Sequence, residues 1–125
     1  MDTSNPFPAH PPERLAAHAR LVAGVVGYAT GASPARILAA PRGRADVASA
    51  RQLAMYLLHG VFAASLAHVA VIFARDRTTV THNLRLIEER REDAAYNDWV
   101  ESLEDMLRAA PAPNAVAAED LGAAP

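Results

Sequence analysis

The sequence predicts an all-α fold of about six helices. Between residues 13 and 109, no segment shows the alternation of apolar and polar residues that is typical of a half-buried strand. Apolar residues recur there at spacings of three and four, which places them on one face of a helix. Glycine, proline, serine and aspartate separate these segments, at positions where helices commonly start and end.

The first two predicted helices are separated by the Gly-Ala-Ser sequence at 31–33. The first helix is predicted over 13–30. Its apolar face is formed by Leu15, Ala19, Val22 and Val26. The second is short and ends near Leu38. Ser33 and Pro34 predict its start, because serine is a favoured N-cap and proline a favoured first helical residue.

Two more helices follow a loop that contains two arginines. The third is predicted over 46–60, with Asp46 as its N-cap. Its inward residues are Val47, Ala50, Leu53, Ala54, Leu57 and Leu58. The fourth is predicted over 66–73, with Ser65 as its N-cap. Its inward residues are Leu66, Val69, Ala70 and Phe73.

The last two predicted helices carry very different charges. Asp76 or Arg77 precedes the fifth, which runs to about Arg91 and buries a stripe formed by Val80, Leu84 and Ile87. The sixth is predicted over 93–108. Its apolar face is formed by Tyr96, Trp99, Val100, Leu103, Met106 and Leu107. Its outer face is acidic, with Asp93, Asp98, Glu101, Glu104 and Asp105.

This pattern predicts one helical domain over 13–92, followed by an acidic amphipathic helix over 93–109. Residues 1–12 carry four prolines and no periodicity, so they predict a disordered arm. Residues 110–125, rich in alanine and proline, predict a disordered tail.

Composition excludes several classes of protein. The chain has no cysteine, so it forms neither disulfides nor thiolate metal sites. Its first residues lack the basic and apolar regions of a secretory signal. The most apolar run, 21–29, is too short to span a membrane. We therefore expect a cytoplasmic protein without membrane contact.

Charge is sorted along the chain. Residues 36–91 contain nine arginines and four acidic residues, whereas residues 92–125 contain eight acidic residues and one arginine. A basic block indicates an anionic partner, although a solvated surface with accidental asymmetry would give the same counts. The chain has no lysine, and arginine suits bidentate contact with phosphate or guanine.

The stretch RDRTTVTH at 75–82 joins the fourth and fifth predicted helices. Two short helices joined by a few residues are typical of a helix-turn-helix, whose second helix presents its first residues to DNA base edges. Arg77 could bridge guanine, and a threonine methyl could pack on a thymine methyl. Asp76 could cap the helix or accept from a cytosine amino group.

The segment that contains this stretch resembles the C-terminal DNA-binding domain, domain IV, of the bacterial replication initiator DnaA. The resemblance covers roughly residues 18–92 and implies both the helical DnaA-box-binding fold and duplex DNA as the ligand. The matching residues are Val47-Ala48, Arg51-Gln52, Ala54-Met55-Tyr56-Leu57, Ser65-Leu66, Phe73, Arg75-Asp76, Thr78-Thr79-Val80, His82, Arg85 and Ile87-Glu88.

The resemblance also implies roles for individual residues. Residues that would read bases are Asp76, Thr78 and Thr79. Residues that would contact the DNA backbone or support the site are Arg51, Arg75, His82 and Arg85. The chain departs from the family in three places. Arg77 replaces the histidine of the family's reading segment, and Ala74 stands alone where the family has two glycines. The minor-groove arginine aligns with Gly43, which Arg42 and Arg44 flank as substitutes.

Neither an enzyme nor a cofactor is expected. No G-x-x-x-x-G-K-[ST] loop is present, so the chain resembles a free-standing version of the DNA-binding domain without the initiator's ATPase. No nucleophile is paired with a base. No pair among His59, His68 and His82 has the i, i+4 spacing of a helical zinc site, so no metal is expected.

Two functions remain. The first is a monomeric, nucleoid-associated DNA-binding regulator that occupies DnaA-box-like sites in double-stranded DNA and modulates replication initiation or transcription. The alternative is a regulator that engages DnaA itself or a factor that inactivates it, with little sequence-specific DNA binding. The acidic sixth helix supplies the candidate protein contacts, which are Tyr96, Trp99, Glu101 and Glu104.

Overall fold

A computed structural model describes residues 12–39 and 45–111 of the chain. These ranges contain six helices and no strand, which confirms the predicted all-α fold. The helices are α1 (Pro12–Thr30), α2 (Pro34–Ala39), α3 (Ala45–Phe62), α4 (Leu66–Phe73), α5 (Arg77–Arg90) and α6 (Ala94–Ala109).

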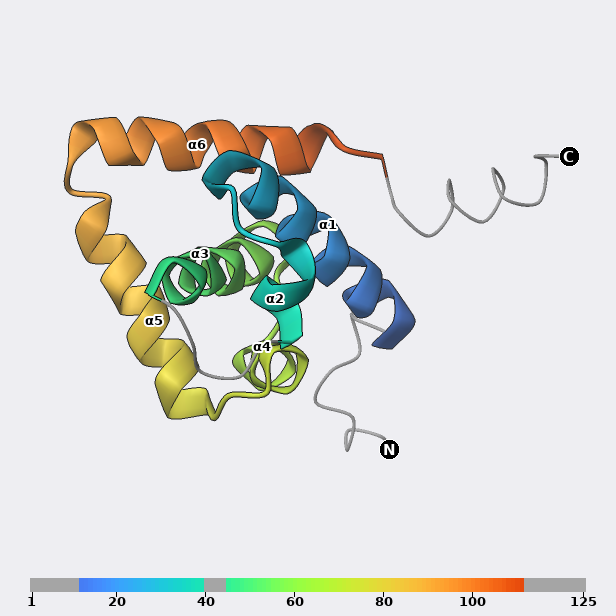
Figure 1. The fold of residues 1–125 in the computed structure, drawn as a ribbon. Coiled ribbons are helices and arrows are strands. Elements are labelled where there is room, and N and C mark those ends of the chain that lie inside the picture. The colour runs from blue at the N-terminus through green and yellow to red at the C-terminus, as the bar shows by residue number, and fades with distance from the viewer. Residues whose placement is uncertain (1–11, 40–44, 112–125) are drawn as a thin grey trace, which may run out of the picture.

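Helix α3 is the centre of the fold, and it contacts each of the five other helices (Figure 1). It can do so because it is apolar on several sides. Its fully buried residues include Leu53, Ala54, Met55, Leu57 and Leu58. Helices α1 and α6 lie on one side of it, whereas α5 runs down another side from α6 toward α4 (Figure 1).

The predicted apolar faces form the core with few exceptions. Leu66, Leu84, Tyr96 and Trp99 are only half-buried, although all four pack against the core. Met106 is 47% exposed, so its predicted place on the buried face of α6 is wrong. It lies at the edge of a narrow stripe. That stripe consists of Val100, Leu103 and Leu107, which join the same core as α1 and α3.

The predicted caps Ser65 and Asp76 start their helices, and α6 starts at a cap that was not predicted from the sequence. Ser65 Oγ accepts a hydrogen bond from the amide of His68 at 3.0 Å, and Asp93 caps α6 through the amide of Tyr96 at 2.9 Å. Helix α3 begins at Ala45, so the prediction that Asp46 is its N-cap is wrong. Asp46 lies inside the first turn, where its backbone is already helical.

The connection from α1 to α2 depends on two glycines. Gly31 has a φ of 83°, which glycine adopts without steric cost, and its amide donates to the carbonyl of Gly27 at 2.8 Å. A Cβ on Gly27 would lie 2.7 Å from the carbonyl oxygen of Ala32. Glycine at both positions therefore lets the chain fold tightly back into α2. Ser33 Oγ accepts from the amide of Arg36 at 3.3 Å, as its predicted capping role requires.

Several predictions lie outside the described residues. They concern residues 1–11 of the predicted arm, residues 112–125 of the predicted tail, and the loop arginines Arg42 and Arg44. Helix α1 begins at Pro12, one residue earlier than predicted.

The turn after α4 is closed by an alanine in the left-handed conformation. Ala74 has φ 54° and ψ 46°, and its amide donates to the carbonyl of Val71 at 3.2 Å. The next amide, of Arg75, donates to the carbonyl of Ala70 at 3.0 Å. This pattern is a Schellman-type helix end, which usually uses glycine because a Cβ is strained there.

We expect Ala74→Gly to stabilise the protein by about 1 kcal/mol, because it removes the strained Cβ. For a domain of this size, that is a rise in Tm of about 4–8 °C, measurable by circular dichroism. Ala95→Gly is the matched control, since Ala95 is exposed and helical and should lose stability on the same change. A fall in Tm for Ala74→Gly would contradict the argument.

Candidate nucleic-acid interface

Helices α4 and α5 form a helix-turn-helix. Only Ala74, Arg75 and Asp76 connect them, and both helices pack against α3 and against each other. The first helix has 8 residues and the second has 14. Val80, Asn83 and Ile87 bury one face of α5, so its opposite face is left to the solvent. This geometry is the one predicted from the sequence.

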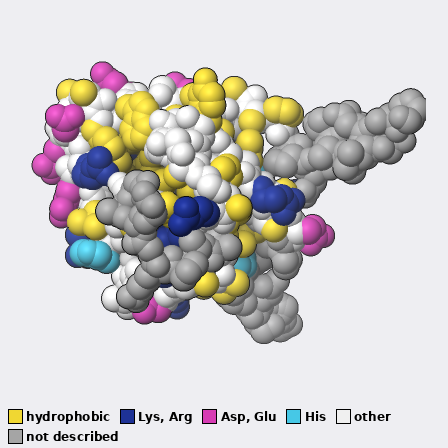
Figure 2. All heavy atoms as spheres, viewed as in Figure 1, with side chains coloured by type: hydrophobic (Ala, Val, Ile, Leu, Met, Phe, Trp, Pro, Cys, Tyr) yellow, Lys and Arg dark blue, Asp and Glu magenta, His cyan; other side chains and the backbone are white. Residues whose placement is uncertain are grey.

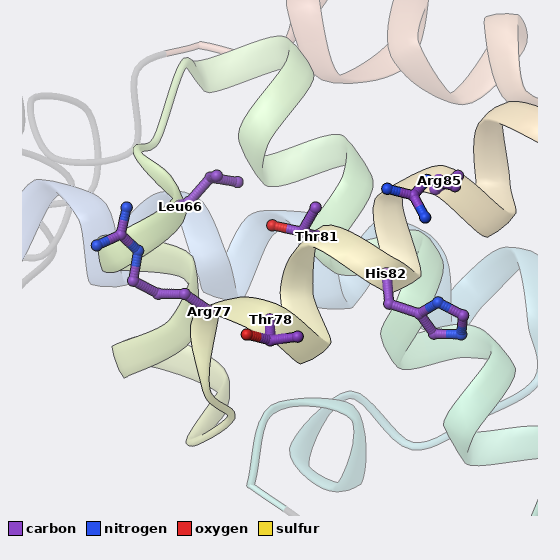
Figure 3. Close-up of a pocket in the computed structure, with 6 residues that line it drawn as sticks. All are labelled: Leu66, Arg77, Thr78, Thr81, His82 and Arg85. Atoms are coloured by element: carbon purple, nitrogen blue, oxygen red, sulfur yellow. The ribbon is translucent and has the colours of Figure 1, made fainter.

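The solvent face of α5 lines an open groove of about 520 Å³ (Figure 3). Its lining residues are Leu66, Arg77, Thr78, Thr81, His82 and Arg85. Leu66 comes from the start of α4, and the side chain of Arg77 extends toward it (Figure 3). The other residues occupy successive turns of α5. The groove therefore runs from the start of the second helix of the motif to Arg85, the ninth of its 14 residues.

Three side chains of this groove carry nitrogen donors that the protein itself does not use. Arg77, His82 and Arg85 are exposed, and within the described ranges none of them forms a hydrogen bond or ion pair. Their donors are therefore available to an external acceptor. Arginine presents these donors in a planar fork that matches phosphate or the O6 and N7 atoms of guanine.

Asp76 and Thr79 form the N-terminal cap of α5. Asp76 Oδ1 accepts from the amide of Thr79 at 2.7 Å. Hydrogen bonds from the amide and the hydroxyl of Thr79, and from the amide of Thr78, lower the pKa of Asp76 below that of an ordinary aspartate. Asp76 therefore caps α5, which was one of its two predicted roles. Contact of Asp76 with a DNA base stays a prediction, as does the predicted base contact of Thr79.

Arg75 supports the turn instead of pointing into the groove. Its Nη1 donates to the carbonyls of Phe73 and Ala74 at 3.0 and 3.2 Å, so the guanidinium folds over the end of α4. Arg75 also lines a second depression, between α3 and the start of α5. That depression is lined by Ala48, Arg51, Gln52, Met55, Arg75, Thr79 and Asn83.

Arg51 is buried, with only 4% of its surface exposed. Its Nε donates to the carbonyl of Ile37 at 2.9 Å, and its Nη2 to that of Arg36 at 2.8 Å. Burial, and secondarily the charge of Arg75, lowers its pKa. Arg51 is therefore committed to the end of α2, which favours the supporting role over a direct DNA contact.

Comparison with known proteins identifies this motif. Residues 20–87, more than half of the chain, match the family described as bacterial dnaA protein helix-turn-helix. The chain belongs to this family. The resemblance seen in the sequence is thereby confirmed.

Relatives of the chain carry the same name. The chromosomal replication initiator proteins DnaA of Ralstonia nicotianae and Burkholderia multivorans are each 41% identical to it over 66 residues. That match covers 51% of this chain but only 13% of each relative. A solved structure described as a DNA replication initiation factor superposes with a TM-score of 0.68 at 28% identity, covering 78% of this chain and 30% of that one.

Beyond the family match, α5 and α6 are joined through Arg91, which caps the end of α5. Its Nη1 donates to Glu104 at 2.9 Å and to the hydroxyl of Tyr56 at 3.0 Å, and its Nε donates to Asn97 at 2.6 Å. The Tyr56 hydroxyl in turn donates to Glu88 at 2.9 Å. The bond to Glu104 is the main cause that raises the pKa of Arg91, so the guanidinium is always charged.

This network corrects one prediction. Glu104 was expected on the acidic outer face of α6, as a candidate protein contact, but it is turned inward and its side chain is 15% exposed. Its charge is balanced by Arg91. Glu101 remains exposed, 3.9 Å from Arg91 at its nearest oxygen, and Tyr96 and Trp99 are half-buried.

Sequence reasoning missed Thr81 and Leu66 in the groove. Thr81 could have been found, because it lies four residues after Arg77 and so on the same face of the helix. Leu66 could not, because only the packing of α4 beside α5 brings it there. Within the described ranges, no helix has the length and apolar content of a membrane span, and no cluster of three or more histidine or acidic side chains could hold a metal.

We expect the stabilisation by Asp76 to depend on pH. Its pKa is lowered in the folded protein, so the charged cap stabilises above about pH 4, the ordinary aspartate value, and this contribution is lost as the pH falls. The Tm difference between the wild type and Asp76→Ala, followed by circular dichroism, should therefore shrink from pH 7 to pH 3.

Asp76→Asn is the control, because asparagine caps a helix but does not titrate. Its Tm difference from the wild type should also shrink toward low pH, from a smaller starting value. A difference for Asp76→Ala that stays constant from pH 7 to pH 3 would contradict the assigned cap.

We expect Glu104→Gln to lower the free energy of unfolding by about 1–3 kcal/mol, because it leaves the shielded Arg91 charge uncompensated. Asp105→Asn is the matched control. Asp105 lies 3.9 Å from Arg108 and its side chain is 82% exposed, so its loss should cost at most about 0.5 kcal/mol in urea unfolding. Equal costs for both variants would show that the Arg91 network does not hold α6.

Proposed function

We propose that this chain is a DNA-binding regulator of the DnaA type, which places α5 in the major groove of DnaA-box-like sites. The observation that carries the proposal is the groove on α5, with three unused cationic or hydrogen-bonding side chains at the start of the second helix of the motif. In a helix-turn-helix, this is the part of the protein that meets base edges. Membership in the DnaA family supports the same reading.

The charge distribution supports this orientation. Helix α5 starts at the end of the molecule near α4 and finishes beside α6, so its reading end lies away from the acidic helix (Figure 1). Exposed acids of α6 would repel the phosphate backbone if they lay beside the groove. Their position at the other end of α5 leaves the groove accessible to a polyanion.

Each residue then has a proposed role. Arg77 reads a guanine at the position where the family has histidine, and Thr78 packs against a neighbouring base. His82 and Arg85, one turn further along, contact phosphates. Arg51 and Arg75 hold the turn and the end of α2, and Arg42 or Arg44 reaches the adjacent minor groove.

We further propose that the protein acts without ATP hydrolysis. Its sequence contains no nucleotide-binding loop, so it would modulate replication initiation or transcription by occupying sites. It would do so as a monomer in the cytoplasm, associated with the nucleoid.

The test is fluorescence anisotropy with a labelled duplex carrying a DnaA box and a scrambled duplex of the same composition, at two salt concentrations. We expect the box to be preferred at both. Arg77→Ala should reduce this preference by about 1–3 kcal/mol, since a bidentate base contact is lost. Arg85→Ala should weaken both duplexes alike and lower the salt slope by about 0.9, the value for one phosphate contact.

Arg108→Ala is the matched control, because Arg108 is an exposed arginine near the end of α6. It should leave both affinities unchanged. Equal binding of the two duplexes by the wild type, or unchanged affinity after both groove substitutions, would contradict the proposal.

A second candidate function is a protein-interaction regulator that engages DnaA or a factor that inactivates it. The observation that favours it is the half-exposed Tyr96 and Trp99 on the acidic helix α6. Retention of purified DnaA or of its inactivating factor on the immobilised chain would support this candidate, and retention of neither would count against it.

A further inference from the structure

We infer that the far end of α5 carries a docking site for a segment of another protein. The segment that fits this site has one bulky apolar side chain with basic residues on either side. The site is a depression bounded by the end of α1, the start of α3, the end of α5 and the start of α6. Its lining residues are Thr30, Ser49, Ala50, Leu53, Arg90, Tyr96 and Trp99. The inference goes beyond the DNA-binding function and does not depend on it.

The shape of the depression fits one bulky side chain. Its volume is about 260 Å³, below the 300–1,000 Å³ that is typical of small-molecule sites. Its floor is apolar, because Ala50 and Leu53 are each 2% exposed. Four separate helices form the walls, so the hollow is shaped by the packed core and not by a single mobile segment.

The rim holds the residue types that dominate binding energy at protein interfaces. These hot spots are enriched in tryptophan, tyrosine and arginine. Here the guanidinium of Arg90 lies 4.1 Å from the ring centroid of Tyr96, and the rings of Tyr96 and Trp99 are 5.7 Å apart. The three side chains are therefore ordered before a partner arrives, which reduces the entropy lost on binding.

The excess of acidic residues around the depression favours a partner segment with basic residues. Residues 88–105 contain eight acidic residues and two arginines. Arg91 is paired with Glu104, and Arg90 is held over Tyr96. Exposed acids within three positions of Arg90, Tyr96 or Trp99 are Glu88, Glu89, Glu92, Asp93, Asp98 and Glu101. Acidic side chains gather at this edge of the molecule, beside hydrophobic ones (Figure 2). A segment with basic flanks complements this surface, whereas an acidic segment is repelled.

The site is separate from the groove at the start of α5. The groove and the depression share no lining residue. Their nearest lining residues on α5, Arg85 and Arg90, are five positions apart, which is about 7.5 Å along the helix axis and places them on different faces of the helix. A partner segment at the end of α5 would therefore leave the groove open, and both sites could be filled at once.

Trp99 is the only tryptophan of the chain, so its fluorescence reports on this site directly. The full 125-residue protein is titrated with three synthetic twelve-residue peptides. The first has a central phenylalanine flanked by lysine and arginine, the second has glutamate flanks, and the third has alanine in place of phenylalanine. We expect saturable binding of the first peptide and at least tenfold weaker binding of the other two.

Ser49→Arg blocks the site without touching the core, because Ser49 is exposed on α3 and arginine is a good helix former. It should weaken the basic peptide at least tenfold. Ala109→Arg, at the exposed far end of α6, is the matched control and should not weaken it. Both variants should bind DNA as the wild type does, so failure of this site and failure of the DNA-binding proposal are distinguishable.

Three outcomes would overturn the inference. Equal binding of all three peptides would show adhesion without recognition. Unchanged binding by Ser49→Arg would place the peptide elsewhere on the protein. A change of Trp99 emission with protein concentration alone would assign the depression to a second copy of the chain.

Discussion

The arrangement of the motif depends on one guanidinium, that of Arg91. It stands at the end of α5, and it is the only side chain in the described ranges that hydrogen-bonds to both α3, through Tyr56, and α6, through Asn97 and Glu104. Helix α5 is anchored at its start by the cap of Asp76 and at its end by Arg91. The apolar contacts of Val80 and Ile87 against the core hold the middle. Both ends of the helix are therefore fixed, and the direction of its exposed face is fixed with them.

A chain without lysine uses arginine for two different tasks. Arg51, Arg75 and Arg91 donate to carbonyls, a hydroxyl or a carboxylate of the protein, and each fixes the end of a helix. Arg77 and Arg85 are exposed on α5 with no partner in the described ranges. A guanidinium group thus either stabilises a helix end inside the protein or presents its donors to the solvent. Its burial and the presence of nearby carbonyl acceptors determine which role it takes. Orphan carbonyls at helix ends are natural acceptors for the internal group.

Much of the fold could be predicted because its signals are local. Ser65 and Asp76 each precede a helical stripe, so their caps and the helix-turn-helix between them follow from neighbouring residues. The failures involve distant partners. Glu104 has the spacing of a solvent-facing acid, and only the position of Arg91, 13 residues earlier, turns it inward. The burial of Arg51 depends on its hydrogen bonds to the carbonyls of residues 36 and 37. No residue close to Arg51 in the sequence predicts these partners. Of the groove, Arg77, Thr78, His82 and Arg85 were predicted, Thr81 was missed although it lies on the same face of α5, and Leu66 required the packing of α4.

The acidic helix α6 lies away from the start of α5, so the charge of the molecule is distributed asymmetrically and gives it a dipole moment. Its net charge is only −2, so its attraction to a polyanion as a whole is weak or negative. The field close to the molecule is different, because Arg77 and Arg85, unpaired within the described residues, lie along the first turns of α5, whereas exposed acids outnumber arginines at its far end and on α6. The field of a nearby duplex would orient such a molecule before contact. A larger share of diffusional encounters would then occur in the orientation that allows binding. Salt at about 0.1 M would limit this orienting effect to separations below about 10 Å, because charges further apart are screened.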